Sequence, residues 1–279
     1  MSIVTEVRPA PTRPAQYAGK VTGRRVLRSE WAKLWSLRST WITLSLGLLF
    51  LLAFGTIAAV RYKVMSTSGQ PADPDFARAT TLSLSLFGVP FALLALGVLG
   101  VLTASGEYTT GMIRSTLTAV PTRLPVLWAK AAVYGVLAFV AGVVGAFAAF
   151  LIGSAVLSGS PIAMTISDSG VVRSLLGVGV YLGLVGVAGV ALGALLRSTA
   201  GGISALVGTF LLVPGLMSLL PASWRDDISQ YLPSNAGESI FALVPAPGML
   251  SAGAGLLVLL GWTALALGGA AYRLMRSDA

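Results

Sequence analysis

The chain has 279 residues, of which 55% are hydrophobic and only 10% charged, and its mean hydropathy is +0.84. Soluble domains average about 25% charged residues, so this composition excludes an ordinary water-soluble domain. Cysteine and histidine are absent, which excludes disulfides, thiolate metal sites, a cysteine nucleophile and Ser-His or HExxH chemistry. We expect no catalytic, metal or cofactor site in this chain and no nucleic-acid partner.

The N-terminal segment, residues 1–22, is polar and basic and carries Pro9, Pro11 and Pro14. This composition is typical of a disordered tail. The first apolar block after it is too long for the core of a signal peptide, so we expect an uncleaved anchor. The segment therefore predicts a disordered cytoplasmic tail ahead of a transmembrane domain over 23–279.

A helix is predicted from Gly23 to Arg38, immediately before the first apolar block. Its apolar residues recur at i, i+4, i+7 and i+8 and so share one face, while basic residues occupy the remainder. This pattern is typical of an amphipathic helix lying in the headgroup plane of a membrane. The helix either orients the first span or also docks a cytoplasmic partner; its apolar face is formed by Leu27, Trp31, Leu34 and Trp35.

Six apolar blocks follow, each free of Asp, Glu, Lys and Arg. A helix needs about 20 residues to cross the hydrocarbon core, so the blocks predict an all-α polytopic membrane protein with six transmembrane helices. Pro90 is expected to kink the second span, and Pro214 lies in the fifth, which is the shortest. The predicted spans are 41–60, 81–104, 131–157, 175–196, 203–220 and 249–272.

The distribution of basic residues predicts the orientation. With the N-terminus inside, most of the 19 basic residues fall on inner segments, and acidic residues lean towards the outer loops. The positive-inside rule then places both termini in the cytoplasm, with the chain in the plasma or inner membrane. The basic residues left on the outer loops are Arg61, Lys63, Arg78, Arg173 and Arg225.

The fourth span contains two GxxxG pairs, Gly179 with Gly183 and Gly189 with Gly193. Such pairs allow two helix backbones to approach closely and to pack by van der Waals contact. The pairs indicate either packing inside one bundle or an interface between subunits.

The predicted cytoplasmic loop between spans two and three has its own helix signals. Thr109 or Thr110 can cap a short helix, with Glu107 near the positive end of its dipole. Pro121 should end that helix, and Thr122 can start the next one. We expect a short rigid helix that couples mechanically to another protein.

These residues resemble the type-2 permeases of ATP-binding cassette (ABC) transporters. In that family the second span ends in Glu-x-x-x-Gly, followed by Leu and then Pro-x-x-Arg. Glu107 and Gly111 match directly, as do Leu117 and Pro121, whereas Arg123 gives Pro-x-Arg. The segment from Arg28 to Trp35 is similar to the family's N-terminal interfacial helix, and the resemblance covers about residues 24–276.

The resemblance implies that 23–279 is a permease domain and that a separate ATP-binding subunit docks on loop 107–123, where Arg114 offers a charge. ATP and Mg would be bound by that partner. The only Gly-Lys pair in the chain, Gly19-Lys20, fails the GxxxxGK[ST] pattern. The resemblance also implies that the chain pairs with a second permease chain, identical or different, to form an exporter.

The predicted outer loop, 221–248, is interrupted by four prolines but contains the apolar stretch Ile240 to Leu243. The resemblance implies short helices that dip back towards the bilayer; the alternative is a loosely ordered loop. The apolar lining of the spans would suit lipids, antibiotics or other amphipathic molecules and indicates no single cargo.

Two other functions remain open from the sequence. An ion-coupled carrier usually places ionisable residues inside the bilayer, and the predicted spans contain none, although backbone carbonyls and hydroxyls can coordinate Na⁺. A non-transporting membrane scaffold, or a membrane enzyme without histidine, is the remaining alternative.

Overall fold

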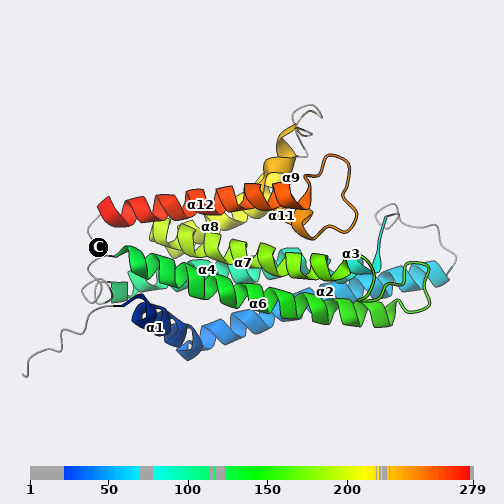
Figure 1. Cartoon of the computed structure of the whole chain (residues 1–279), viewed down its shortest axis with the longest axis horizontal. Helices are drawn as coiled ribbons and strands as arrows, with labels where there is room; N and C mark the ends of the chain where they lie inside the picture. Colours follow the sequence, from blue (N-terminus) through cyan, green and yellow to red (C-terminus); the bar gives the residue numbers. More distant parts are fainter. Residues whose placement is uncertain are drawn as a thin grey trace, which may run out of the picture.

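The structure is a computed structural model that describes residues 22–68, 78–113, 116, 123–217, 219, 221, 225 and 227–276. Within these residues all regular structure is helical. The long helices run side by side as one bundle, and both described ends of the chain, Thr22 and Arg276, lie at the same end of it (Figure 1). Apart from Thr22, the predicted disordered tail lies outside the described residues.

Six helical segments are long and apolar enough to cross a membrane, as the sequence predicts for a multi-pass membrane protein. Five of them are single helices. The remaining one, Thr199–Met217, is a continuous segment made of α8, a π-helix and α9. The five are α2 (Arg38–Thr67), α4 (Val89–Thr109), α6 (Leu124–Val156), α7 (Val171–Leu196) and α12 (Ala252–Arg276).

Most of these helices extend beyond the charge-free blocks. The helix α6 begins seven residues before the predicted start of its span and so includes Lys130, and α4 continues through Glu107. Helix α2 likewise includes Arg38, Arg61 and Lys63 near its two ends. A predicted boundary at the first charged residue is therefore wrong, because charged side chains near a helix end can reach polar surroundings or pair with opposite charges, as Glu107 and Lys130 do, while the backbone stays helical.

The second predicted span is broken rather than kinked at Pro90. A short helix, α3 (Thr81–Ser85), ends before residues 86–88, and α4 then begins at Val89. Pro90 therefore lies in the first turn of α4, where a missing N–H costs no hydrogen bond. The break packs tightly on α2, since a Cβ on Gly88 would lie 2.5 Å from the carbonyl oxygen of Leu51.

The fifth span is irregular next to its proline. The π-helix Gly208–Leu212 separates α8 (Thr199–Val207) from α9 (Val213–Met217), which carries Pro214. The amide of Val213 donates to the carbonyl of Gly208, five residues back. A proline ring crowds the preceding turn of a helix, and the wider π-turn accommodates it.

The helix α7 lies at the centre of the bundle, and its glycines face two different neighbours. A Cβ on Gly189 or Gly193 would lie 2.3 Å from Gly97 O or 2.5 Å from Val101 O of α4. On the other side, a Cβ on Gly179 would lie 2.3 Å from Val143 Cγ2 of α6, and one on Gly183 would lie 3.2 Å from Phe139 Cβ. Both pairs therefore lie at contacts within this chain.

The predicted outer loop contains short helices in its described part. A 3₁₀ turn, Ser229–Tyr231, precedes α11 (Pro233–Phe241), which packs on α7 and α12. The side chain of Arg173 donates to the carbonyls of Ile240 and Ala242 at the end of α11, at 3.1 and 2.8 Å. This satisfies carbonyls that a helix C-terminus leaves without partners.

Substituting Gly189 tests the close contact between α7 and α4. Gly189→Ala should destabilise the folded chain by about 1–3 kcal/mol, because the added methyl group overlaps backbone that cannot move independently. The measurement is equilibrium unfolding in mixed detergent micelles. The matched control is Gly261→Ala in α12, where no atom lies within 4 Å of the added carbon. That variant should be neutral or slightly stabilising, and equal behaviour of the two variants would contradict the packing argument.

Candidate functional site

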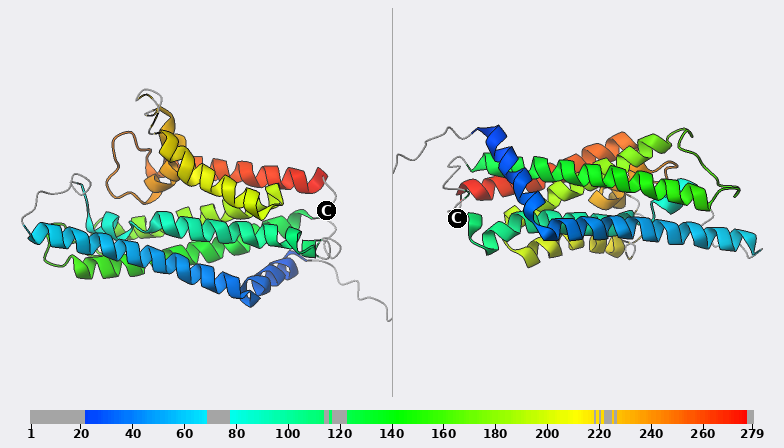
Figure 2. Two further views of the ribbon diagram at one scale, coloured as in Figure 1. Left: turned by 180° about the vertical axis from the view of Figure 1, so that it is seen from behind. Right: turned by 90° about the horizontal axis from the view of Figure 1, so that it is seen from below.

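The helix α1 (Gly23–Ser36) brings charged residues to the end of the bundle where α4 ends and α6 begins. It meets α2 at a sharp corner at Leu37 (Figure 2), whose backbone is extended. Val26 of α1 packs on Val126 and Ala129 of α6. Because residues four apart share a helix face, this contact also directs Glu30 towards the start of α6.

Four side chains form an ion-pair cluster here: Glu30 and Lys33 of α1, Glu107 of α4 and Lys130 of α6. The Nζ of Lys130 lies 2.6 Å from Glu30 Oε2 and 2.9 Å from Glu107 Oε1. The Nζ of Lys33 lies 2.6 Å from Glu30 Oε1 and 2.9 Å from the same Glu107 oxygen. Two carboxylates and two ammonium groups thus alternate, and the cluster is electrically neutral.

The cluster is buried, with 3% of Glu30, 5% of Glu107 and 9% of Lys130 exposed, and only Lys33 is partly accessible. Removing such ions from water costs several kcal/mol each, and close pairing offsets this cost. Glu107 lies in the last turn of α4, where the helix dipole is negative and disfavours a carboxylate. The two lysines therefore hold Glu107 in a position that its own helix disfavours.

Glu30 and Lys33 both belong to α1, outside the membrane-spanning helices, and of the two only Lys33 is partly exposed. Burial lowers the pKa of Lys33, but hydrogen bonds and charge from Glu30 and Glu107 outweigh it, so that the pKa is raised. Lys33 consequently remains protonated at neutral pH, and its charge is constant under physiological conditions.

The predicted coupling residues have mixed outcomes. Glu107 belongs to the last turn of α4, and the hydroxyls of Thr109 and Thr110 donate back to Gly106 O, so these two threonines do not cap a new helix. Gly111 follows the end of α4 with φ +72°, a conformation that favours glycine. Met112, Ile113 and Thr116 are helical, and Arg114, Leu117 and Pro121 lie outside the described residues.

The helix α6 begins close to Thr122, the residue predicted to start it. Its first residue is Leu124, with Arg123 in place of Thr122 at the N-cap position. Arg123 has φ 53°, and its Nη1 donates to the carbonyl of Leu274 near the end of α12, at 3.4 Å. At the same end of the bundle, Arg273 donates to Leu195 O and Arg197 lies over the ring of Tyr108. Arginines therefore connect the ends of α4, α6, α7 and α12.

The predicted interfacial face of α1 is divided between two environments. Leu34 is buried against the bundle, together with Val26 and Glu30, whereas Leu27, Trp31 and Trp35 are exposed to between 42 and 44%. Glu30, Lys33 and Lys130 were not predicted to form a site. The available signal was Glu30 itself, a charge placed four residues from both Val26 and Leu34 on one helix face.

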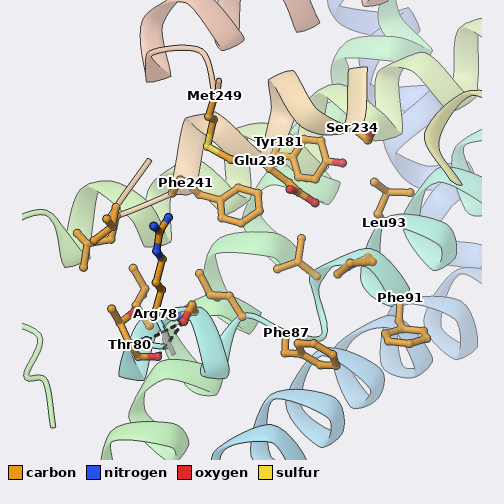
Figure 3. A pocket seen from close by; sticks show the side chains of 18 of the residues that line it. Arg78, Thr80, Phe87, Phe91, Leu93, Tyr181, Ser234, Glu238, Phe241 and Met249 are labelled. Carbon is orange, nitrogen blue, oxygen red and sulfur yellow. Dashed lines mark hydrogen bonds between the residues drawn. The ribbon is translucent and has the colours of Figure 1, made fainter. Parts of the chain in front are cut away.

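A cavity of about 570 Å³ opens in the other half of the molecule, away from the ion-pair cluster. Its wall comes from α3 and the start of α4, from the π-helix, from α7 and from α11 with the residues after it. Figure 3 shows the Glu238 carboxylate beside the rings of Tyr181 and Phe241. The surrounding protein raises the pKa of Glu238 by burial, although its accessible surface faces the cavity.

The described residues contain no group of three or more His, Cys, Asp or Glu side chains arranged to hold a metal ion. No protein-family model matches the chain, and its sequence matches no curated protein. The two features of this chain that bear on its function are therefore the ion-pair cluster and the cavity.

Removing one lysine tests the cluster. Lys130→Met should destabilise the chain by about 3–5 kcal/mol, because it leaves two buried carboxylates with the single ammonium group of Lys33 between them. Adding Glu30→Gln restores neutrality, since Lys33 still pairs with Glu107, and should recover about 0.5–3 kcal/mol. Unfolding in mixed micelles measures both values. Strictly additive losses in the double variant would show that Glu30 and Lys130 do not interact.

Proposed function

We propose that this chain is the permease subunit of an ABC transporter, an exporter driven by a separate ATP-binding subunit that docks on the cytoplasmic loop 107–123. The observation that carries the proposal is the ion-pair cluster. It joins both helices that flank this loop, through Glu107 and Lys130, to α1. The resemblance of Glu107 and Gly111 to the Glu-x-x-x-Gly motif of type-2 permeases supports the same assignment.

The cluster gives the loop a mechanical connection to the bundle. The chain leaves α4 after Glu107 and enters α6 before Lys130, so the loop is anchored at both ends within two helical turns. A force on the loop would displace α1, α4 and α6 together, because packed interiors move as rigid bodies between discrete arrangements. ATP-driven closure of two ATPase subunits would then switch a pair of permease chains between inward-open and outward-open states.

The charge distribution supports a cytoplasmic position for this end of the bundle. Arg24, Arg28, Arg123, Arg273 and Arg276 belong to segments that meet here, as the positive-inside rule requires. The exposed indoles of Trp31, Trp35 and Trp41 contact one another at the corner between α1 and α2, with centroid distances of 5.5 and 4.4 Å. Tryptophans gather at membrane interfaces, so α1 is proposed to lie in the inner headgroup layer.

An ion-coupled carrier is a second candidate, and Glu238 is the observation that favours it. The sequence contains no ionisable residue within the predicted spans, but the fold brings this carboxyl group to the cavity from α11. Its raised pKa makes protonation at mildly acidic pH easier than for a glutamate free in water. A proton-coupled carrier requires a titratable group of this kind on the substrate path.

The ATPase can be sought in a neighbouring reading frame with a GxxxxGK[ST] motif. Coexpressed with the chain, it should copurify in detergent and hydrolyse ATP in lipid nanodiscs. Arg114→Glu should weaken this copurification, since it reverses the charge offered to the partner, whereas Arg61→Glu at the opposite end of α2 should leave it unchanged. Failure of any such ATPase to copurify would contradict the proposed function.

Glu107→Ala tests the coupling itself. The variant should insert in the membrane and retain the ATPase, but ATP should no longer change the shape of the cavity, because the loop has lost its connection to α1. The chain contains no cysteine, so Ser83→Cys and Val244→Cys allow two spin labels across the cavity without background. Labelled chain is diluted with unlabelled chain, and the distance between the labels is measured by pulsed electron paramagnetic resonance.

The wild-type distance should change on addition of ATP, and so should that of the control Asp168→Asn, which removes a carboxylate outside the cluster. An equal ATP response in Glu107→Ala would overturn the coupling role of the cluster. A response to a proton gradient without ATPase, abolished by Glu238→Gln, would instead favour the ion-coupled carrier.

A further inference from the structure

The cavity contains one acidic side chain in a wall that is otherwise mostly apolar. Its volume of about 570 Å³ lies within the range of about 300–1,000 Å³ typical of sites for small organic ligands. Phe210 of the π-helix, Tyr181 of α7 and Phe241 of α11 contribute aromatic rings to the wall. Among the described residues that line the cavity, only Glu238 and Arg78 carry a charge.

The Glu238 carboxylate is available to a ligand. The described part of the chain gives this side chain no hydrogen bond and no ion pair, Arg78 included. Figure 3 shows the Arg78 guanidinium on the other side of the Phe241 ring from the Glu238 carboxylate. Both side chains are solvent-accessible, so their charges are screened from each other. The Glu238 carboxylate is therefore a negative charge beside aromatic rings that a cation can approach.

Two irregular backbone segments create the space in front of Glu238. The break at residues 86–88 and the π-helix at Gly208–Leu212 both line the cavity. Irregular backbone at membrane depth is tolerated where it is buried in protein or borders a cavity, and π-turns are frequent at functional sites. The cavity is thus built into the course of the helices and does not depend on side-chain rotamers alone.

The chemistry of the wall selects one class of ligand. An anion would be repelled by Glu238, and a neutral apolar ligand would leave an ionised carboxylate without water or a partner. A cation with an apolar body gains from the carboxylate at low dielectric and from the aromatic faces, and it covers the remaining apolar wall. A strongly hydrated inorganic cation would find too few oxygen ligands here.

We propose that the cavity binds a hydrophobic organic monocation, with Glu238 as its counter-ion and Tyr181, Phe210 and Phe241 packed around its apolar groups. This inference rests on the proposed function, because it names the class of cargo that the permease would carry. The contacts needed for binding are local to the cavity, so binding requires neither ATP nor the ATPase subunit.

Binding should also depend on pH through Glu238. Protonation removes the counter-ion, and the surrounding protein raises the pKa of this carboxyl group by desolvation, so affinity should fall on acidification at a higher pH than for a glutamate free in water. Other ionisable groups lie on the elements packed around Glu238. They are Tyr181 and Arg173 of α7, Tyr231 of the 3₁₀ turn and Arg78 across the cavity, while the ionisable residues of α12 lie at its far end.

The experiment measures binding of radiolabelled tetraphenylphosphonium to the full chain in lipid nanodiscs, with empty nanodiscs as the blank. Wild-type chain should show saturable binding. Glu238→Gln should weaken the binding about tenfold or more, since the charge pair between the carboxylate and the cation in a low-dielectric cavity is lost. Asp168→Asn, which removes an exposed carboxylate from a turn outside the cavity, should leave the affinity unchanged. The neutral triphenylphosphine oxide should bind the wild type and Glu238→Gln equally.

Equal affinity of wild type and Glu238→Gln for the cation, or absence of saturable binding to the wild type, would overturn the inference. If Glu238→Gln fails to purify as a single species, the wild type alone decides, because its affinity must fall on acidification while that for the neutral compound stays constant. The same preparations are tested for ATPase copurification. If the ATPase copurifies but the cation does not bind, only the proposed ligand class is wrong. If the cation binds but no ATPase copurifies, only the proposed ABC permease function is wrong.

Discussion

Lys130 lies between two buried carboxylates, and this arrangement is the constraint on which one end of the molecule depends. Neither Glu30 nor Glu107 can be buried without a cation, and Lys130 supplies it to both at 2.6 and 2.9 Å. The pairing requires α1 to lie across α6, with Val26 on Val126 and Ala129. It also requires α4 to end beside α6. The positions of α1, α4 and α6 at this end of the bundle therefore follow from the need to pair two negative charges with cations.

The rest of the bundle depends on close backbone contact. Lipid provides no hydrophobic driving force for helix association, so packing of small residues takes its place. The central helix α7 uses Gly189 and Gly193 against α4 on one side and Gly179 and Gly183 against α6 on the other. Since α4 and α6 also meet at the ion-pair cluster, a displacement at one end has a rigid path through α7 to the cavity.

The cavity forms where two membrane-length segments depart from regular helix. Breaking the chain between α3 and α4, and widening the turn before Pro214, both leave room that α11 and its Glu238 partly enclose. A carboxylate from outside the spans can thus serve a site between them. This explains how a chain with charge-free span centres still presents one titratable group to an apolar cavity, which the spans alone do not indicate.

The sequence by itself determined the number of spans, because about 20 apolar residues in a row have no stable alternative to a membrane helix, and its charge pattern marked one end of the bundle as basic. It also indicated α1 from its apolar period, and Glu107 and Gly111 from their motif. Only the tertiary structure decided that Glu30, Lys33, Glu107 and Lys130 meet, that the chain breaks before Pro90, and that Glu238 faces a cavity. These depend on contacts between distant residues, such as Glu30 and Lys130, which are 100 positions apart, and local patterns carry no information about such contacts. The sequence shows which residues are charged, but the packing of the helices determines which of them form ion pairs.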